Sequence, residues 1–215
     1  MRKINTVIFD LDGVITDTAE FHFLAWKRVS QEENLYFDKS INENLKGVSR
    51  IDSLKIILNK NNREITAEKL KKLSERKNIY YLELINTVTP ENLLPGICRI
   101  LKFFKNKNIN IALGSASKNA RLVLNKLKIF DYFDLIGDGN CVINSKPAPD
   151  IFLYCAKQLG VFPENCIVIE DAEAGIEAAK QAGMKTVGIG SREKLNKADY
   201  IYFSPADIDL NIIIK

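Results

Sequence analysis

Short runs of apolar residues recur along the chain and alternate with segments of helical periodicity. The first run is Val7 to Phe9, and the others span residues 109–113, 133–136, 166–169, 186–189 and 200–203. Between most of them, apolar residues recur at helical spacing, in 97–104, 121–127, 151–159 and 174–182. Such runs are typical of strands buried on both faces. Their alternation with helices predicts an α/β fold with a doubly wound, Rossmann-like parallel sheet.

Residues 17–88 break this alternation. From Thr18 to Val88 the pattern favours consecutive helices without a strand, and Thr89-Pro90 and Pro95-Gly96 mark the end of the segment. We therefore expect an α/β core made of residues 1–16 and 89–215. A helical cap of residues 17–88 would be inserted after the first strand and lie over the edge of the sheet.

Size and charge limit the possible partners. With 215 residues, 46% of them hydrophobic, the chain can bury one substantial core. The net charge of +4 is spread along the sequence, and the densest basic run, 69–77, contains Glu75 and is typical of a solvated helix face. No alternation of basic and aromatic residues indicates nucleic-acid binding, and no apolar stretch is long enough to span a membrane. Since the N-terminus leads directly into a strand, we expect a cytoplasmic protein.

The cysteines and the histidine do not suggest a zinc site or a cysteine nucleophile. Cys98, Cys141, Cys155 and Cys166 show no C-x-x-C spacing, and His22, the only histidine, lies far from them in sequence. We expect four buried, reduced thiols.

Two of the predicted strands end in pairs of acidic residues. The first leads into Asp10 and Asp12 and then Gly13, and the run 166–169 leads into Glu170-Asp171. Each pair alone has a simpler explanation, as a turn or as acids at a helix start. At the carboxyl edge of one parallel sheet, however, such carboxylates repel one another unless a cation lies between them. Oxygen ligands of this kind suit Mg²⁺.

Three further segments offer positive or hydrogen-bonding groups to an anion. Ser115 to Asn119 follow the strand 109–113, Lys146 lies in a loop stiffened by two prolines, and Arg50 follows Ser49 in a capped helix start, Ser49-x-x-Asp52. Taken singly, these residues also fit a helix N-cap, a surface lysine and an exposed arginine. Thr18, His22 and Trp26 are spaced to form one stripe on a helix near Asp12, although a lone His or Trp is usually a core residue.

The ordered set Asp10-x-Asp12, Ser115, Lys146 and Glu170-Asp171 resembles the haloacid dehalogenase-like superfamily of phosphoryl-transfer enzymes over nearly the whole chain. The resemblance implies that Asp10 is a nucleophile that becomes an aspartyl phosphate and that Asp12 is a general acid and base. It also implies a Mg²⁺ cofactor held by Asp10, the backbone carbonyl of Asp12, and Asp171, with Glu170 close by.

The segments 12–26, 45–50 and 114–119 resemble the phosphoglucomutase branch of this superfamily, with Gly114 in place of a more usual Ala. The resemblance implies an isomerase that converts β-D-glucose 1-phosphate to D-glucose 6-phosphate through β-glucose 1,6-bisphosphate. Ser115, Ala116, Lys146 and Asn119 would serve the transferring phosphate, and Arg50 would hold the other one. The remaining implied substrate and cap contacts are Thr18, His22, Trp26, Gly47, Val48, Ser49 and Lys77.

Two other functions fit parts of this pattern. A sugar-phosphate phosphatase of the same superfamily would use water as the final acceptor. A non-enzymatic receiver-like module also uses Asp, Lys and Mg²⁺ on a doubly wound sheet, but such modules are shorter and lack a helical insertion. A cap that opens and closes over a small sugar phosphate fits a monomer.

Overall fold

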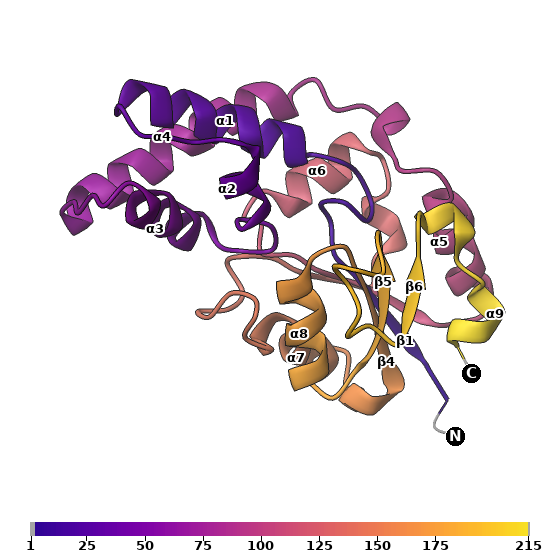
Figure 1. Cartoon of the computed structure of the whole chain (residues 1–215). Coiled ribbons are helices and arrows are strands. Elements are labelled where there is room, and N and C mark those ends of the chain that lie inside the picture. Colours follow the sequence, from indigo (N-terminus) through magenta and orange to yellow (C-terminus); the bar gives the residue numbers. More distant parts are fainter. Residues whose placement is uncertain (1–2, 215) are drawn as a thin grey trace.

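The computed structural model describes residues 3–214 and contains one six-stranded parallel sheet. Its strands lie in the order β3-β2-β1-β4-β5-β6, which confirms the predicted doubly wound topology. Figure 1 shows β1 in the middle of the sheet, with helices on both sides. The strands are β1 (Thr6–Phe9), β2 (Asn110–Gly114), β3 (Leu135–Gly137), β4 (Cys166–Glu170), β5 (Lys185–Ile189) and β6 (Tyr200–Tyr202).

Alternate residues of the strands supply two hydrophobic cores, one on each face of the sheet. Val7 and Phe9 of β1 face a core shared with α5 (Ile97–Asn106), α6 (Ala120–Lys126) and α9 (Leu210–Ile213). Ile8 faces the opposite core, which is shared with α7 (Asp150–Gln158) and α8 (Glu173–Gln181). Because β1 is covered on both faces, its sequence is continuously apolar. Short 3₁₀ turns span Pro90–Asn92, Phe130–Tyr132, Pro163–Asn165 and Pro205–Asp207.

Residues 17–88, called the helical segment below, form a separate layer at the carboxyl edge of the sheet (Figure 1). The segment contains α1 (Ala19–Glu32), α2 (Lys39–Glu43), α3 (Arg50–Lys60) and α4 (Ala67–Ile85). These helices enclose an apolar cluster of their own, which includes Trp26, Val29, Leu54, Ile57 and Leu73. The rest of the chain is called the α/β core. The two connections between it and the helical segment run side by side, since Leu94 N donates to Ile15 O at 2.9 Å.

The expectation of four buried thiols is wrong. Cys98 is exposed and Cys141 only half-buried, although all four cysteines are free. In α5 the buried residues Ile97, Ile100, Leu101 and Phe104 form one stripe, and Cys98 lies outside it. The charged residues of the basic run 69–77 are mostly exposed, as expected for a solvated helix face, whereas Lys77 at its end is buried at 2% exposure.

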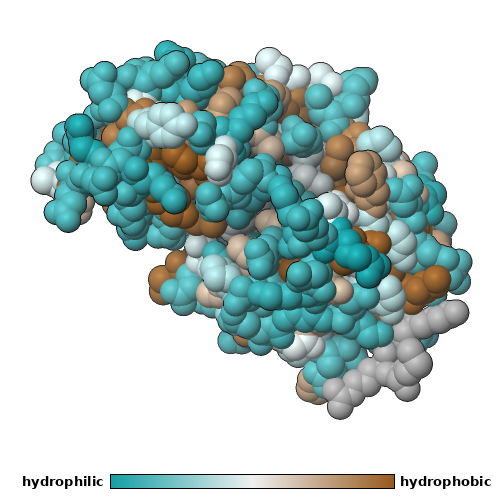
Figure 2. Space-filling model, in the orientation of Figure 1, coloured by the Kyte–Doolittle hydropathy of each residue, from teal (hydrophilic) through white to brown (hydrophobic). Residues whose placement is uncertain are grey.

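Hydrophilic side chains cover most of the face seen in Figure 2, over both the helical segment and the α/β core. Within residues 3–214, no helix is long and apolar enough to cross a bilayer.

Candidate active site

The carboxylates of Asp10, Glu170 and Asp171 converge where β1 and β4 end. The two strands are neighbours in the sheet, and one oxygen of each carboxylate lies within 4.8 Å of the others. Asp10 and Glu170 are buried, at 5% and 0% exposure. Three carboxylates this close repel one another strongly when all are ionised, unless a cation lies between them.

Lys146 supplies one positive charge to this cluster. Its Nζ donates to Asp10 Oδ1 at 2.5 Å and to Glu170 Oε2 at 2.9 Å. Burial would lower the pKa of the ammonium, but the neighbouring charges of Asp10 and Glu170 raise it above its ordinary value. Lys146 is therefore a permanent cation beside the Asp10 carboxylate.

Lys146 alone does not balance the negative charge of the three carboxylates. Burial and the neighbouring Asp10 raise the pKa of Asp171 to about 7, and they raise that of Glu170 well above its ordinary value. A divalent cation held by carboxylate oxygens would relieve both effects.

Two glycines leave the space in which these carboxylates lie. A Cβ on Gly13, whose φ is +83°, would lie 2.2 Å from Asp171 Oδ2, and one on Gly175 would lie 2.1 Å from Glu170 Cδ. The space left by the two glycines is filled by the carboxylates of Asp171 and Glu170. Because these residues and Asp10 present only oxygen donors, the site fits Mg²⁺.

Asp12 lies near this cluster, but its side chain is bonded to a different set of residues. Its Oδ1 accepts a hydrogen bond from Thr18 Oγ1, and its Oδ2 lies 3.8 Å from His22 Nε2. Burial, followed by the charges of Asp10 and Asp171, raises the pKa of Asp12 to about 8. In the absence of metal its carboxyl group therefore carries a proton at neutral pH.

His22 connects Asp12 to a buried lysine of the helical segment. Lys77 Nζ lies 2.7 Å from His22 Nδ1 and 4.6 Å from the centre of the Tyr81 ring. Burial, then Lys77 and Arg50, lower the pKa of His22 well below its ordinary value, so the ring is neutral. When Nδ1 accepts from Lys77, the ring proton lies on Nε2 and faces Asp12.

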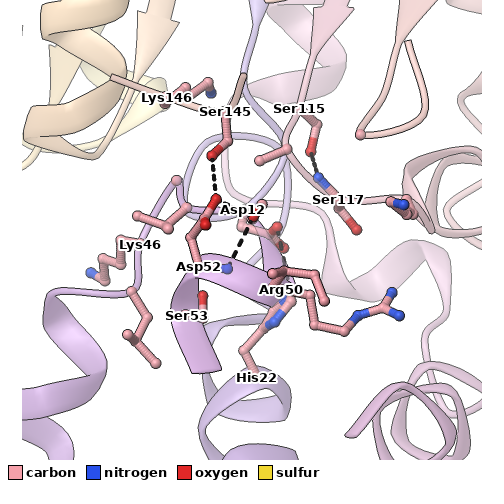
Figure 3. Close-up of a pocket in the computed structure, with 18 of the residues that line it drawn as sticks. Asp12, His22, Lys46, Arg50, Asp52, Ser53, Ser115, Ser117, Ser145 and Lys146 are labelled. Carbon is pink, nitrogen blue, oxygen red and sulfur yellow. Dashed lines mark hydrogen bonds and ion pairs between the residues drawn. The ribbon is translucent and has the colours of Figure 1, made fainter. Parts of the chain in front are cut away.

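One cavity of about 600 Å³ joins these groups and lies between the helical segment and the α/β core (Figure 3). Of the sequence-predicted residues, Thr18 and Glu170 do not line it: both are buried behind it, against Asp12 and Lys146 respectively. The predicted residues that do line it are Asp10, Asp12, His22, Trp26, Gly47, Val48, Ser49, Arg50, Lys77, Ser115, Ala116, Asn119, Lys146 and Asp171.

Arg50 is a cation of this cavity that no carboxylate of the described residues pairs with. It stands at the first position of α3, after the N-cap Ser49, and is half-buried. Within the part of the chain that the structure describes, its guanidinium forms no ion pair closer than 4 Å, and burial lowers its pKa. Such a group is suited to an anionic ligand.

Sequence reasoning missed several residues of the cavity. Lys46 Nζ lies 3.8 Å from Asp171 Oδ2, and Ser117 and Lys118, which belong to the predicted segment Ser115 to Asn119 but were not singled out in it, line the same space. Ser117 N donates to Ser115 Oγ at 3.1 Å, which fixes the loop after β2. Lys46 directly precedes the predicted Gly47 to Arg50 segment, so its sequence position was the available signal.

Gly114 at the end of β2 departs from the pattern that the resemblance implies. A Cβ there would lie 2.9 Å from Phe152 Cε1 and 3.0 Å from Ile8 Cγ2. Phe152 of α7 takes up the space that a methyl group would need. The departure therefore changes core packing below the site and leaves the site residues in place.

A doubly wound core with carboxylates at its strand ends, facing a helical insertion, is the architecture expected for a phosphoryl-transfer enzyme of the haloacid dehalogenase-like superfamily. The chain belongs to the haloacid dehalogenase-like hydrolase family, whose model matches residues 4–183. This membership confirms the resemblance inferred from the motifs.

Within the family, the chain is 48% identical to beta-phosphoglucomutase of Bacillus subtilis (strain 168), over 98% of this chain and 94% of that protein. A crystal structure of beta-phosphoglucomutase from Clostridium difficile matches with a TM-score of 0.95 at 46% identity, covering 98% of this chain and 95% of that one. A phosphorylated carbohydrates phosphatase of Thermotoga maritima is 33% identical, over 86% of this chain and 84% of that protein.

Proposed function

We propose that the protein is a Mg²⁺-dependent phosphoglucomutase that interconverts β-D-glucose 1-phosphate and D-glucose 6-phosphate. The observation that carries this proposal is the pairing of two separate anion-binding positions in one cavity. Asp10 with Lys146 lies at one wall, and the unpaired Arg50 lies on the helical segment. A mutase needs both, because β-glucose 1,6-bisphosphate must bind in either orientation. The similarity to beta-phosphoglucomutases supports the same conclusion.

Asp10 is the proposed nucleophile. One carboxylate oxygen forms a bond to phosphorus while the bond from phosphorus to the sugar oxygen breaks, which gives an aspartyl phosphate. Lys146 stabilises the negative charge on the transferring group, and Ser115 and Ala116 lie at the same wall of the cavity. Bound Mg²⁺, held by Asp10, Asp171 and the Asp12 carbonyl with Glu170 beside them, would neutralise further charge there.

Asp12 is the proposed general acid and base. Its raised pKa leaves a proton available for the departing sugar oxygen, and the ionised form then accepts a proton from the attacking hydroxyl. A hydrogen bond from Thr18 holds one oxygen of its carboxyl group in place, and the other oxygen faces His22 Nε2 at 3.8 Å. Lys77 sets the tautomer of His22 and, with Trp26, lies along the cavity wall that faces the sugar.

Residues 17–88 are the proposed cap, with the α/β core formed by 1–16 and 89–215. The separate apolar cluster of the four helices and the adjacent connections at Ile15 and Leu94 support hinged movement. Closure would bring Arg50 and the Gly47 to Ser49 turn onto the substrate and exclude water. A cap of this kind needs no second subunit, and light scattering after gel filtration would test the monomer.

The deciding experiment incubates the enzyme with β-glucose 1-phosphate, a trace of β-glucose 1,6-bisphosphate and Mg²⁺. The mutase produces glucose 6-phosphate, whereas a sugar-phosphate phosphatase, as one relative is named, produces free phosphate. The α anomer, run in parallel, tests the anomer preference. A long-lived phosphate on Asp10 without sugar turnover would instead indicate a receiver-like module.

A further inference from the structure

A hydrogen bond joins the helical segment to the loop that carries Lys146. Ser145 Oγ donates to Asp52 Oδ2 at 3.3 Å, across 93 residues of sequence (Figure 3). Asp52 lies in the first turn of α3, two residues after Arg50. The bond therefore connects the helix start that presents Arg50 to the residue beside Lys146.

Both ends of this bond are held in place locally. Asp52 N donates to Ser49 Oγ at 3.2 Å, and Ser49 Oγ donates to Asp52 Oδ2 at 2.6 Å, so the Asp52 carboxylate is part of the cap of α3. On the other side, Ala148 N donates to Ser145 O at 3.0 Å and closes a turn around Lys146. Local hydrogen bonds therefore fix the Asp52 carboxylate at the start of α3 and the Ser145 backbone in the loop that carries Lys146.

The anchoring of α3 differs from that of α1 and α4. Ala25 of α1 and Tyr81 and Ile85 of α4 belong to the core that β1 shares with α5, α6 and α9, so these two helices are packed onto the α/β core. The buried apolar residues of α3, Leu54, Ile57 and Leu58, belong only to the cluster of the helical segment. The position of α3 against the α/β core therefore depends on polar contacts such as the Ser145 to Asp52 bond.

We propose that Ser145 and Asp52 are positioning residues that hold α3 against the loop that carries Lys146 and so direct the phosphoryl group to sugar rather than to water. The inference rests on the proposed mutase function. With the bond intact, Arg50 stays over the cavity while Asp10 carries its phosphoryl group. Without it, α3 spends more time away from the core, and water reaches the same phosphorus atom. A water oxygen then bonds to phosphorus, the water gives a proton to Asp12, and the bond to Asp10 breaks.

The test compares Ser145→Ala with the wild-type enzyme and with Thr66→Ala. Ser145→Ala removes the bond but leaves the Ser49 and Asp52 cap intact. Thr66 caps α4 by accepting from Lys69 N at 3.2 Å, on an exposed turn, so Thr66→Ala removes a cap from the same segment without touching the Ser145 contact. The measured quantity is the phosphate released per glucose 6-phosphate formed.

We expect Ser145→Ala to raise this ratio about three- to ten-fold, Ser145→Thr, which keeps the hydroxyl, to restore it, and Thr66→Ala to leave it unchanged. In an Asp52→Ala background, Ser145→Ala should add nothing, because the two residues act through one bond. A ratio in Ser145→Ala equal to that of the wild type would overturn the proposal.

A second readout separates this inference from the proposed function. If the wild-type enzyme forms no glucose 6-phosphate, the mutase proposal fails, and small-angle X-ray scattering with Mg²⁺ then decides about the contact. A larger radius of gyration in Ser145→Ala than in the wild type and Thr66→Ala supports the positioning role. Equal radii in all three proteins reject it.

Discussion

Asp10 and Asp12 are two residues apart and are bonded to different partners. Asp10 accepts from Lys146, whereas Asp12 is bonded to Thr18 and faces His22. The alternation of side chains along an extended chain does not by itself separate them, since residues two apart point the same way. The turn at Gly13 and the start of α1 separate them, because these features bring Thr18 and His22 to Asp12.

Replacing the proposed nucleophile should abolish the covalent step. Asp10→Asn keeps the size of the side chain but removes the attacking carboxylate, so no acyl phosphate should form and turnover should fall roughly 10³-fold or more. Mass spectrometry of the protein after incubation with β-glucose 1,6-bisphosphate and Mg²⁺ measures the phosphorylated fraction. An acyl phosphate on this variant would assign the nucleophile to another residue.

Arg50 tests the second phosphate position. Arg50→Ala removes a charge-assisted contact of about 1.5 to 3 kcal/mol, so glucose 6-phosphate production should fall about ten-fold or more. Arg50→Lys keeps the charge but loses the planar fork, and we expect an intermediate rate. Unchanged glucose 6-phosphate production by Arg50→Ala would contradict the assignment.

Gly13 tests the shape of the proposed metal site. Gly13→Ala places a Cβ against Asp171 and should lower the affinity for Mn²⁺, measured by titration calorimetry, about ten-fold or more. Gly183 is a matched control, because its φ of +75° is similar and nothing lies within 4 Å of an added Cβ. Gly183→Ala should therefore lose a similar amount of stability while keeping its Mn²⁺ affinity. Equal Mn²⁺ affinities in the two variants would show that Gly13 does not shape the site.

At the scale of elements, Asp199 links α8 to β5 just before β6. Its Oδ1 accepts from Lys180 Nζ at 2.5 Å, and its Oδ2 accepts from Thr186 N at 2.7 Å. Partial burial would raise the pKa of Asp199, but these hydrogen bonds hold it below its ordinary value. The depressed pKa means that the stabilisation is present above the unfolded-state pKa and is lost as the pH falls through the folded-state value.

Asp199→Asn should therefore lower the melting temperature at pH 7 by about 2 to 4 °C, which corresponds to roughly 1 kcal/mol. The difference from the wild type should shrink as the pH falls below about 3.8, the ordinary pKa of an aspartate, because the unfolded wild-type chain then takes up a proton that the folded carboxylate resists. Calorimetric melts at pH 7 and pH 3.5 measure both values. A difference that does not change with pH would show that the charge is not the cause.

The strands were predictable because each is buried on one or both faces. β1 and β4 are covered on both faces and appear as unbroken apolar runs, and even half-buried β6 was identified from its tyrosines and isoleucine. The exposure of Cys98 was also predictable in principle, since helical spacing places it off the apolar stripe of α5. Contacts such as that between Asp52 and Ser145 were not, because both residues are polar and neither carries a periodic signal.

At the scale of the whole molecule, the sequence order of the motifs predicted which side chains would meet, and the fold explains why. Parallel strands all end at one edge, so Asp10, Glu170 and the loop after β2 must approach one another. The strand pattern does not predict how the helical segment lies over this edge. The sequence gives no sign of the contacts that this arrangement creates. Lys46 lies beside Asp171, and Lys194 Nζ lies 3.0 Å from Glu43 Oε2.

The carboxylate cluster should make the stability of the whole protein depend on metal. Burial and Asp10 raise the pKa of Asp171 to about 7, so a charge at this position is costly until a cation is bound. Mg²⁺ at 100 times its dissociation constant should therefore stabilise the fold by about 2.7 kcal/mol, a rise in melting temperature of roughly 5 to 11 °C. A chelator should reverse this rise and stop turnover without unfolding the protein, since Lys146 still bridges Asp10 and Glu170. Asp171→Asn should show no rise in melting temperature with Mg²⁺. Without metal it should melt no lower than the wild type, because the substitution removes a buried charge. An undiminished rise in this variant would exclude Asp171 as a ligand.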